Sequence, residues 1–263
     1  GRVFSLSPDS QLLLFTRSVT QSEHLNELWL VRTTEATPNP VPLNLTDVLW
    51  ADWHPSGQPG ERLVAWSSAE AVEQAPGWRG NNDLWTATLT DKNTLTARQV
   101  VLEPESGGGY GWWGTRYAWS PDGSTLALSR PDGVGLVDVR AATVTPLVSF
   151  APFRTFSSWA WNPSLSWSPD GELLSAVIHV GSNVAETHEE SPVFDLAIVS
   201  PAGTVSATLA TEVGMWATPQ FSPNGGRLLF GRATVPYQSA TSSYELVTID
   251  RDGSNRTTVY APQ

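Results

Sequence analysis

The apolar positions of this chain fall in short runs that are separated by turn residues. At five places a stretch resembling Ser-Pro-Asp-Gly lies between two such runs, and two copies are identical, "WSPDG" at 119–123 and at 167–171. The other copies begin at Ser7, His54 and Ser222. Two short apolar runs joined by a turn are typical of a β-hairpin. The second run of each predicted hairpin covers residues 12–15, 63–66, 126–128, 173–178 and 228–230.

The residues of this repeated stretch are those of a tight turn. Pro has its φ already set for the second turn position, Asp or Asn tolerates the third, and Gly supplies a positive φ at the fourth. This pattern predicts a type I turn that closes with a bulge. We therefore expect Ser120 and Asp122 to bond local backbone and not a substrate.

Two further apolar runs follow each hairpin. Four antiparallel strands that recur about every 50 residues are typical of a β-propeller blade. The third runs cover 27–30, 83–85, 135–137, 195–198 and 245–247, and the fourth runs cover 41–45, 98–102, 144–148, 205–209 and 257–260.

The sequence thus predicts an all-β fold, a β-propeller of four-stranded antiparallel blades with five repeats. We expect one domain over residues 1–263, with blades near 1–48, 49–113, 114–157, 158–214 and 215–263. The alternative is a six-bladed propeller with one blade outside this chain.

The "WSPDG" units, together with "DRDGSN" at 250–255, resemble the TolB-type propeller repeats, a WD-like repeat that bears a Pro-Asp pair. Ser10, His54, Ser56 and Asn224 depart from the pattern in single copies. TolB-type propellers usually have six blades, which is why the six-bladed alternative stays open. The resemblance implies a bacterial, extracytoplasmic setting, periplasmic or at the cell surface, and protein partners.

Composition narrows the classes of partner. A net charge of −11 with only 15 Lys and Arg argues against nucleic acid, because binding to phosphates depends on clustered cations. Without Cys, disulfides and thiolate metal sites are excluded. The apolar runs are far shorter than the ~20 residues of a membrane-spanning helix, so we expect no membrane span.

Binding residues are expected where the repeats differ. The second-to-third loops are long in four units (19–26, 69–82, 181–193 and 234–244), and long loops on a rigid scaffold often carry function. Aromatic side chains gather there and in the connections between blades, where packing between blades is the competing interpretation. We expect the acidic residues in these loops to form a solvated surface, and a cation or a basic segment is the natural partner if they are functional. The candidate contact residues are Trp50, Trp78, Arg79, Trp112, Trp113, Trp159, Trp216 and Tyr237, of which Trp78 and Tyr237 are expected to be exposed.

No catalytic constellation stands out. The first strands contain one carboxylate, Asp52, whereas glycosidase chemistry needs two facing acids. A Gly-x-Ser-x-Gly nucleophile elbow is absent, and the four His have no ligand spacing, so we predict no catalytic residue, cofactor or metal site. We predict a non-catalytic module that binds protein or peptide or serves as a scaffold. The alternatives are a carbohydrate-binding or carbohydrate-active propeller, using Asp52 with Glu186, Glu189 or Glu190, and the accessory propeller of a hydrolase whose catalytic domain is absent here.

Overall fold

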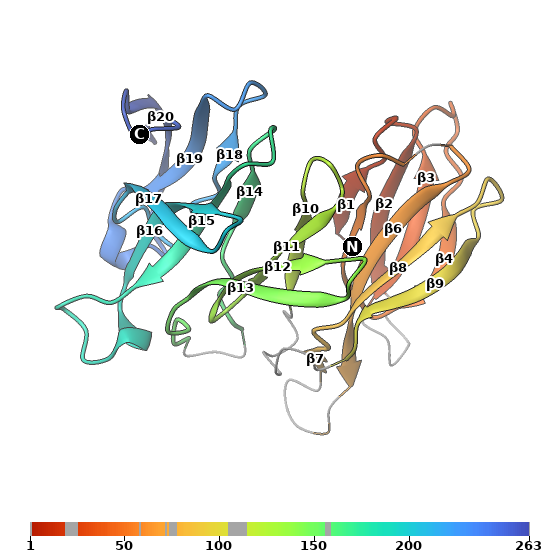
Figure 1. Ribbon diagram of the computed structural model, residues 1–263, viewed down its shortest axis with the longest axis horizontal. Helices are drawn as coiled ribbons and strands as arrows, with labels where there is room; N and C mark the ends of the chain where they lie inside the picture. Colours follow the sequence, from red (N-terminus) through yellow and green to blue (C-terminus); the bar gives the residue numbers. More distant parts are fainter. Residues whose placement is uncertain are drawn as a thin grey trace. The chain divides into compact units, whose positions relative to one another are not determined.

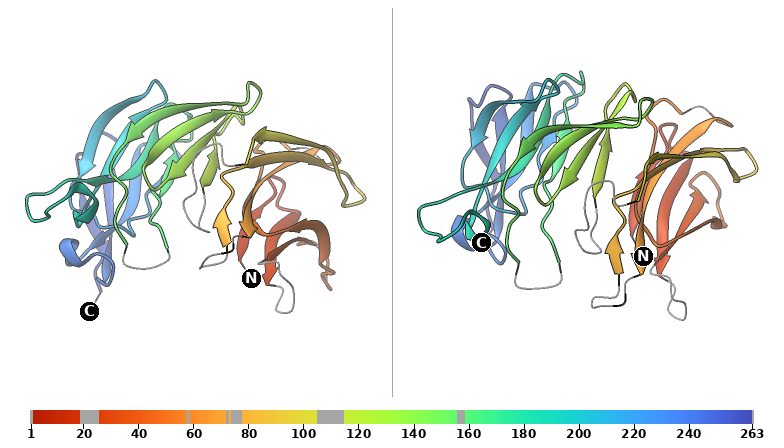
Figure 2. Two further views of the ribbon diagram at one scale, coloured as in Figure 1. Left: turned by 90° about the horizontal axis from the view of Figure 1, so that it is seen from below. Right: turned by 60° about the horizontal axis from the view of Figure 1, so that its bottom comes forward.

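The computed structural model describes residues 2–18, 26–57, 59–71, 73, 78–104, 115–155 and 159–262. Within them the chain forms five antiparallel sheets, each with four strands in chain order (Figures 1 and 2). The first two sheets contain β1 (Val3–Leu6), β2 (Leu12–Ser18), β3 (Asn26–Arg32), β4 (Val41–Thr46), β5 (Val48–Trp53), β6 (Arg62–Ala71), β8 (Leu84–Leu89) and β9 (Leu95–Leu102).

The remaining three sheets repeat the same order. All twenty strands that the sequence predicts are therefore present, and the prediction of an all-β chain of four-stranded sheets is confirmed. They contain β10 (Arg116–Trp119), β11 (Thr125–Arg130), β12 (Gly133–Asp138), β13 (Thr143–Ser149), β14 (Leu165–Trp167), β15 (Leu174–Val180), β16 (Val193–Ser200), β17 (Thr204–Ala210), β18 (Gln220–Phe221), β19 (Arg227–Ala233), β20 (Tyr244–Asp250) and β21 (Thr257–Tyr260).

One strand was not predicted. β7 (Trp78–Gly80) pairs with the far end of β6, with Ala69 opposite Gly80 (Figure 1). Part of the expected loop at 69–82 is thus a short hairpin. Two 3₁₀ turns, η2 (His188–Glu190) and η3 (Pro236–Gln238), lie in the other long loops. In the described part of the chain, no helix is both long enough and apolar enough to cross a membrane.

The chain divides into two compact units, each with its own core. Unit 1 comprises Gly1–Ser124 and Val139–Thr143, and unit 2 comprises Thr125–Asp138 and Val144–Gln263. The division falls within the third sheet, and whether all five sheets make one domain stays a prediction. Alternate residues are buried in some strands, as in β2, where Leu12 and Leu14 are buried and Leu13 is half-buried, whereas six consecutive residues of β16 are buried.

The two cores join side chains of successive sheets. In unit 1, leucines of β2 and β3 pack with Val64, Trp66 and Leu89 of the second sheet. In unit 2, the fourth and fifth sheets contribute Phe194 and Phe230, and Trp161 lies among them. Burial of such side chains stabilises the fold by roughly 1.5–3 kcal/mol each.

The repeated stretches form the predicted turns. The Gly123 and Gly171 backbone N–H groups donate to the carbonyls of Ser120 and Ser168, both at 2.9 Å. The two glycines have φ of +74° and +72°, the left-handed region that favours glycine. Ser120 Oγ donates to Asp122 Oδ1 at 2.6 Å, so the expected local role of these polar groups is confirmed.

Some turn residues also bond the next sheet. Within unit 1, Arg62 pairs with Asp9, and His54 Nε2 lies 3.0 Å from the carbonyl oxygen of Gly123. Within unit 2, Arg251 Nη1 lies 2.7 Å from Asp170 Oδ2. Hydrogen bonds from Ser168 and Arg251 lower the pKa of Asp170 to about 2. The turns therefore tie neighbouring sheets together.

Candidate functional site

The connections of unit 2 hold two contacts, a stacked pair of indoles and a tyrosine that is bonded to a carboxylate. We call Trp159, Trp216, Tyr237 and Glu212 the aromatic surface. Trp216 lies in the connection between β17 and β18 and is 47% exposed. Its indole stacks on that of Trp159, with ring centroids 5.7 Å apart and planes 29° apart. Exposed Trp side chains give a large contact area and are frequent at binding surfaces.

The Trp216 indole is held in place by the loop that carries η3. Its Nε1 donates to the carbonyl of Ala240 at 3.2 Å, and its backbone N donates to Tyr244 Oη at 3.0 Å. Tyr244 Oη in turn donates to the carbonyl of Ser239 at 2.9 Å. Gly214 is required here, because a Cβ at its φ of +94° would lie 2.7 Å from Tyr244 Oη. The exposed indole is thus preorganised, which reduces the entropy lost on binding.

Tyr237 and Glu212 supply the polar part of the aromatic surface. Tyr237 belongs to η3, is 47% exposed, and donates from Oη to Glu212 Oε1 at 2.7 Å. This bond to a carboxylate raises the pKa of Tyr237, so the phenol stays protonated. Among the described residues, no Lys or Arg forms an ion pair with Glu212. The carboxylate keeps acceptor capacity for a cationic partner.

Glu212 is held in an unusual backbone conformation. Its φ is +55°, a region that non-glycine residues seldom adopt. The Glu212 backbone N donates to Asp195 Oδ1 at 2.9 Å, and burial raises the pKa of Asp195. Strained residues of this kind often cluster at binding sites. The bond to Asp195 fixes the position of Glu212 beside Tyr237.

The predicted contact residues lie in different parts of the structure. Trp159 and Trp216 stack on each other in unit 2, whereas Tyr237 bonds Glu212 and has the exposure expected for it. Trp50 is half-buried in unit 1, and its ring centroid lies 5.2 Å from that of Tyr117. Other predicted residues lie outside the described part, namely Trp112 and Trp113 entirely and Trp78 and Arg79 in their side chains.

Sequence reasoning did not find Glu212 or Asp195 as site residues. The available signal was the position of Glu212 in the connection "TEVGMW", four residues before Trp216. Trp161, two residues after Trp159, is only 2% exposed and donates from Nε1 to the carbonyl of Met215 at 2.8 Å. For Trp161 the packing interpretation is therefore confirmed.

The acids of the enzymatic alternative belong to different units, Asp52 to unit 1 and Glu186, Glu189 and Glu190 to unit 2. Burial raises the pKa of Asp52, whose Oδ1 accepts from the Trp53 backbone N at 2.8 Å. Glu190 belongs to unit 2 and pairs with Arg154 at 2.7 Å. Glu186 and Glu189 are exposed.

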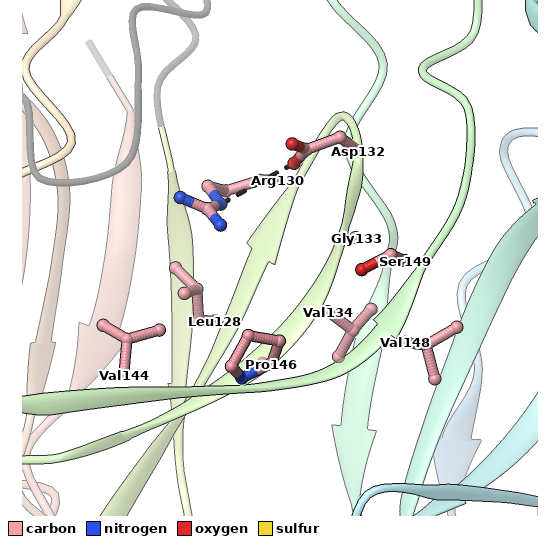
Figure 3. Close-up of a pocket in the computed structure, with 10 residues that line it drawn as sticks. Leu128, Arg130, Asp132, Gly133, Val134, Val144, Pro146, Val148 and Ser149 are labelled. Atoms are coloured by element: carbon pink, nitrogen blue, oxygen red, sulfur yellow. Dashed lines mark ion pairs between the residues drawn. The ribbon is translucent and has the colours of Figure 1, made fainter.

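A small hollow of about 80 Å³ lies on the third sheet in unit 2 (Figure 3). It forms where Gly133 and Gly135 of β12 present no side chain, between Leu128 of β11 and Pro146 of β13. A Cβ on Gly133 would lie 2.5 Å from the carbonyl oxygen of Val148, so the glycine permits the close approach of β13. This hollow is explained by strand packing.

The fold matches propeller domains of solved peptidases. The chain matches Pyrococcus horikoshii acylaminoacyl peptidase at 11% identity and a TM-score of 0.55, over 100% of this chain and 39% of that chain. Prolyl oligopeptidase B from Galerina marginata, bound to a 35mer hydrolysis and macrocyclization substrate, matches at 10% identity and a TM-score of 0.62, over 100% and 34%. The β-propeller domain of the trilobed protease from Pyrococcus furiosus matches at 11% identity and a TM-score of 0.52, over 98% and 70%.

These likenesses define the fold class. The chain is an all-β protein with the β-propeller fold, similar to propeller domains of prolyl oligopeptidase-family peptidases at low identity. It spans 39% and 34% of the first two peptidase chains. No protein-family model and no curated protein matches the sequence.

Proposed function

We propose that this chain is a non-catalytic propeller that binds peptide segments as the accessory module of a peptidase. The observation that carries the proposal is the exposed Trp216 indole, which stacks on Trp159 and belongs to the connection that also carries Glu212, the partner of Tyr237. The similarity to propeller domains of peptidases supports the accessory role, although fold alone does not define function. Protein and peptide partners were also the main expectation from the sequence.

The chemistry of the aromatic surface favours a cationic side chain. An Arg or Lys over an indole face gains cation–π attraction of about 0.5–2 kcal/mol. Glu212 would accept hydrogen bonds from the same group, and such charge-assisted bonds are strong. The net charge of −11 would also attract a basic segment. We therefore propose an extended peptide with arginine as the ligand class.

The finer expectations stand as part of this proposal. A TolB-type assignment and a bacterial, extracytoplasmic setting rest on the repeat motif at 119–123 and 167–171.

A sugar ring would also stack on an indole, but the Tyr237–Glu212 pair supplies a negative charge that a neutral sugar does not need. Peptide is therefore preferred to carbohydrate.

Calorimetry with a short synthetic peptide that carries a central arginine tests the proposal. Replacing that arginine by glutamine should weaken binding about tenfold, because a charge-assisted bond is lost. Glu212→Gln should have a similar effect and should remove the preference for arginine. Trp216→Ala should weaken the binding of both peptides, since the stacking surface disappears.

Tyr260→Ala provides the matched control. Tyr260 is a more exposed aromatic residue at 57%, on β21 and outside the aromatic surface. This variant should bind the arginine peptide like the wild type. Equal binding by wild type, Trp216→Ala and Glu212→Gln would refute the proposal, as would binding of a neutral oligosaccharide in place of both peptides.

A further inference from the structure

The first strands of three successive sheets lie side by side in unit 1. β5 contacts both β1 and β10. Trp53 Nε1 of β5 donates to the carbonyl of Ser5 in β1 at 3.2 Å. On the other side, the Trp50 ring lies against the Tyr117 ring of β10, with centroids 5.2 Å apart. Residues at the beginnings of these strands are therefore brought together.

Two arginines occupy these beginnings. Arg2 immediately precedes β1, and its Nη1 donates to the carbonyl of Leu49 in β5 at 3.3 Å. Arg116 is the first residue of β10, next to the buried Tyr117. Because successive side chains of a strand point to opposite faces, Arg116 points away from Tyr117, and it is exposed.

The two guanidinium groups lack an acidic partner in the described residues. Arg62 and Arg251 pair with turn acids, whereas neither Arg2 nor Arg116 forms an ion pair there. Surrounding protein lowers the pKa of Arg116, and the charge of Arg2 lowers it further. An arginine remains protonated despite such a shift. Two like charges that have no counter-charge among the described residues repel each other, and a bound anion would remove that cost.

We propose that Arg2 and Arg116 bind a carboxylate, namely the free C-terminal carboxylate of a peptide. The planar fork of a guanidinium group matches the two oxygens of a carboxylate, and the two arginines together offer donors for both. A singly charged carboxylate is favoured over phosphate, because the net charge of −11 repels a dianion more strongly. This site does not rest on the aromatic surface, which lies in unit 2.

Thermal unfolding at constant ionic strength tests the proposal with N-acetylated alanine tripeptide, whose carboxylate is its one charge. The tripeptide should raise the unfolding temperature of the wild type, and its C-terminally amidated counterpart should not. Arg116→Gln and Arg2→Gln should each weaken the affinity about tenfold. Arg98→Gln removes an exposed arginine from β9 and should bind like the wild type.

Unfolding without ligand separates a binding role from a structural one. Arg116→Gln should unfold at the same temperature as the wild type or higher, because the substitution relieves the repulsion from Arg2. Lower unfolding temperatures for both glutamine variants without ligand would assign the two side chains a structural role and overturn the proposal. An equal response to the amidated tripeptide, or a response to inorganic phosphate alone, would also overturn it.

Discussion

The repeated turns and the irregular connections use their polar and aromatic side chains in opposite ways. In the turns, Asp122 and Asp170 are occupied by neighbouring Ser side chains, and Asp170 also by Arg251. In the connection before β18, Trp216 and Glu212 keep exposed surface and acceptor capacity. The polar side chains of the repeated turns therefore hydrogen-bond to one another. The side chains of the irregular connections remain available to a ligand.

The largest expected contrast lies between two tryptophans of the connections. Trp161→Ala should lower the free energy of unfolding by about 3–5 kcal/mol, since it empties a buried volume next to Phe194. Trp216→Ala should cost less, about 1 kcal/mol, because about half of the Trp216 surface is already exposed in the folded state. Denaturant unfolding of both variants measures the difference, and equal costs would show that Trp216 is a core residue.

The two identical turns should respond differently to a methyl group. A Cβ on Gly123 would lie 2.2 Å from His54 Nε2 at a φ of +74°. Gly123→Ala should therefore cost roughly 3 kcal/mol, and Gly171→Ala roughly 1–2 kcal/mol from backbone strain alone. In denaturant unfolding, adding His54→Ala should restore part of the free energy of unfolding that Gly123→Ala loses. It should restore none of the free energy of unfolding that Gly171→Ala loses. Equal relief at both positions would contradict the packing described here.

The smallest expected effect is the contribution of the Asp170 carboxylate to the free energy of unfolding. Hydrogen bonds lower the folded pKa of Asp170 to about 2, below the ordinary value near 3.9. Its stabilising contribution is therefore present above about pH 4 and is lost as the pH falls toward 2. Because Asp170 is exposed, Asp170→Asn should cost about 1 kcal/mol or less at pH 7, and this cost should vanish once the pH has fallen below the folded pKa of about 2.

A double-mutant cycle assigns this small contribution. Arg251→Gln should couple to Asp170→Asn, since the two side chains pair at 2.7 Å, and should not couple to Asp122→Asn. The cycle is measured by denaturant unfolding at pH 7. Equal coupling to both aspartates would show that the effect of Arg251 is long-range and does not come from the pair.

The strands were predictable from the sequence because apolar runs and turn residues are local signals. β7 was not, because Trp78–Gly80 forms a strand by pairing with an extension of β6 and has no alternation of its own. Trp159 and Trp216 were both named as candidates, but their stacking arises only when the fourth and fifth sheets pack. Glu212 was missed, because its hydrogen bond to Tyr237 joins two loops that are separate in sequence.

The pair of arginines was hidden for the same reason. Arg2 and Arg116 stand at the beginnings of first strands, a position that the repeat alignment gives, but their proximity follows from the adjacency of β1, β5 and β10. A sequence pattern places residues at one end of a strand. Which strands are neighbours, and which charges remain without partners, follows from packing between sheets.

The central claim is that the irregular connections bind and the repeated turns only hold the fold. The most direct measurement is the affinity of the arginine peptide for two double variants, Trp159→Ala/Trp216→Ala and Asp122→Asn/Asp170→Asn. We predict that the tryptophan variant loses binding at least about tenfold while the aspartate variant binds like the wild type. Loss of binding in the aspartate variant alone, or undiminished binding in the tryptophan variant, would contradict the claim.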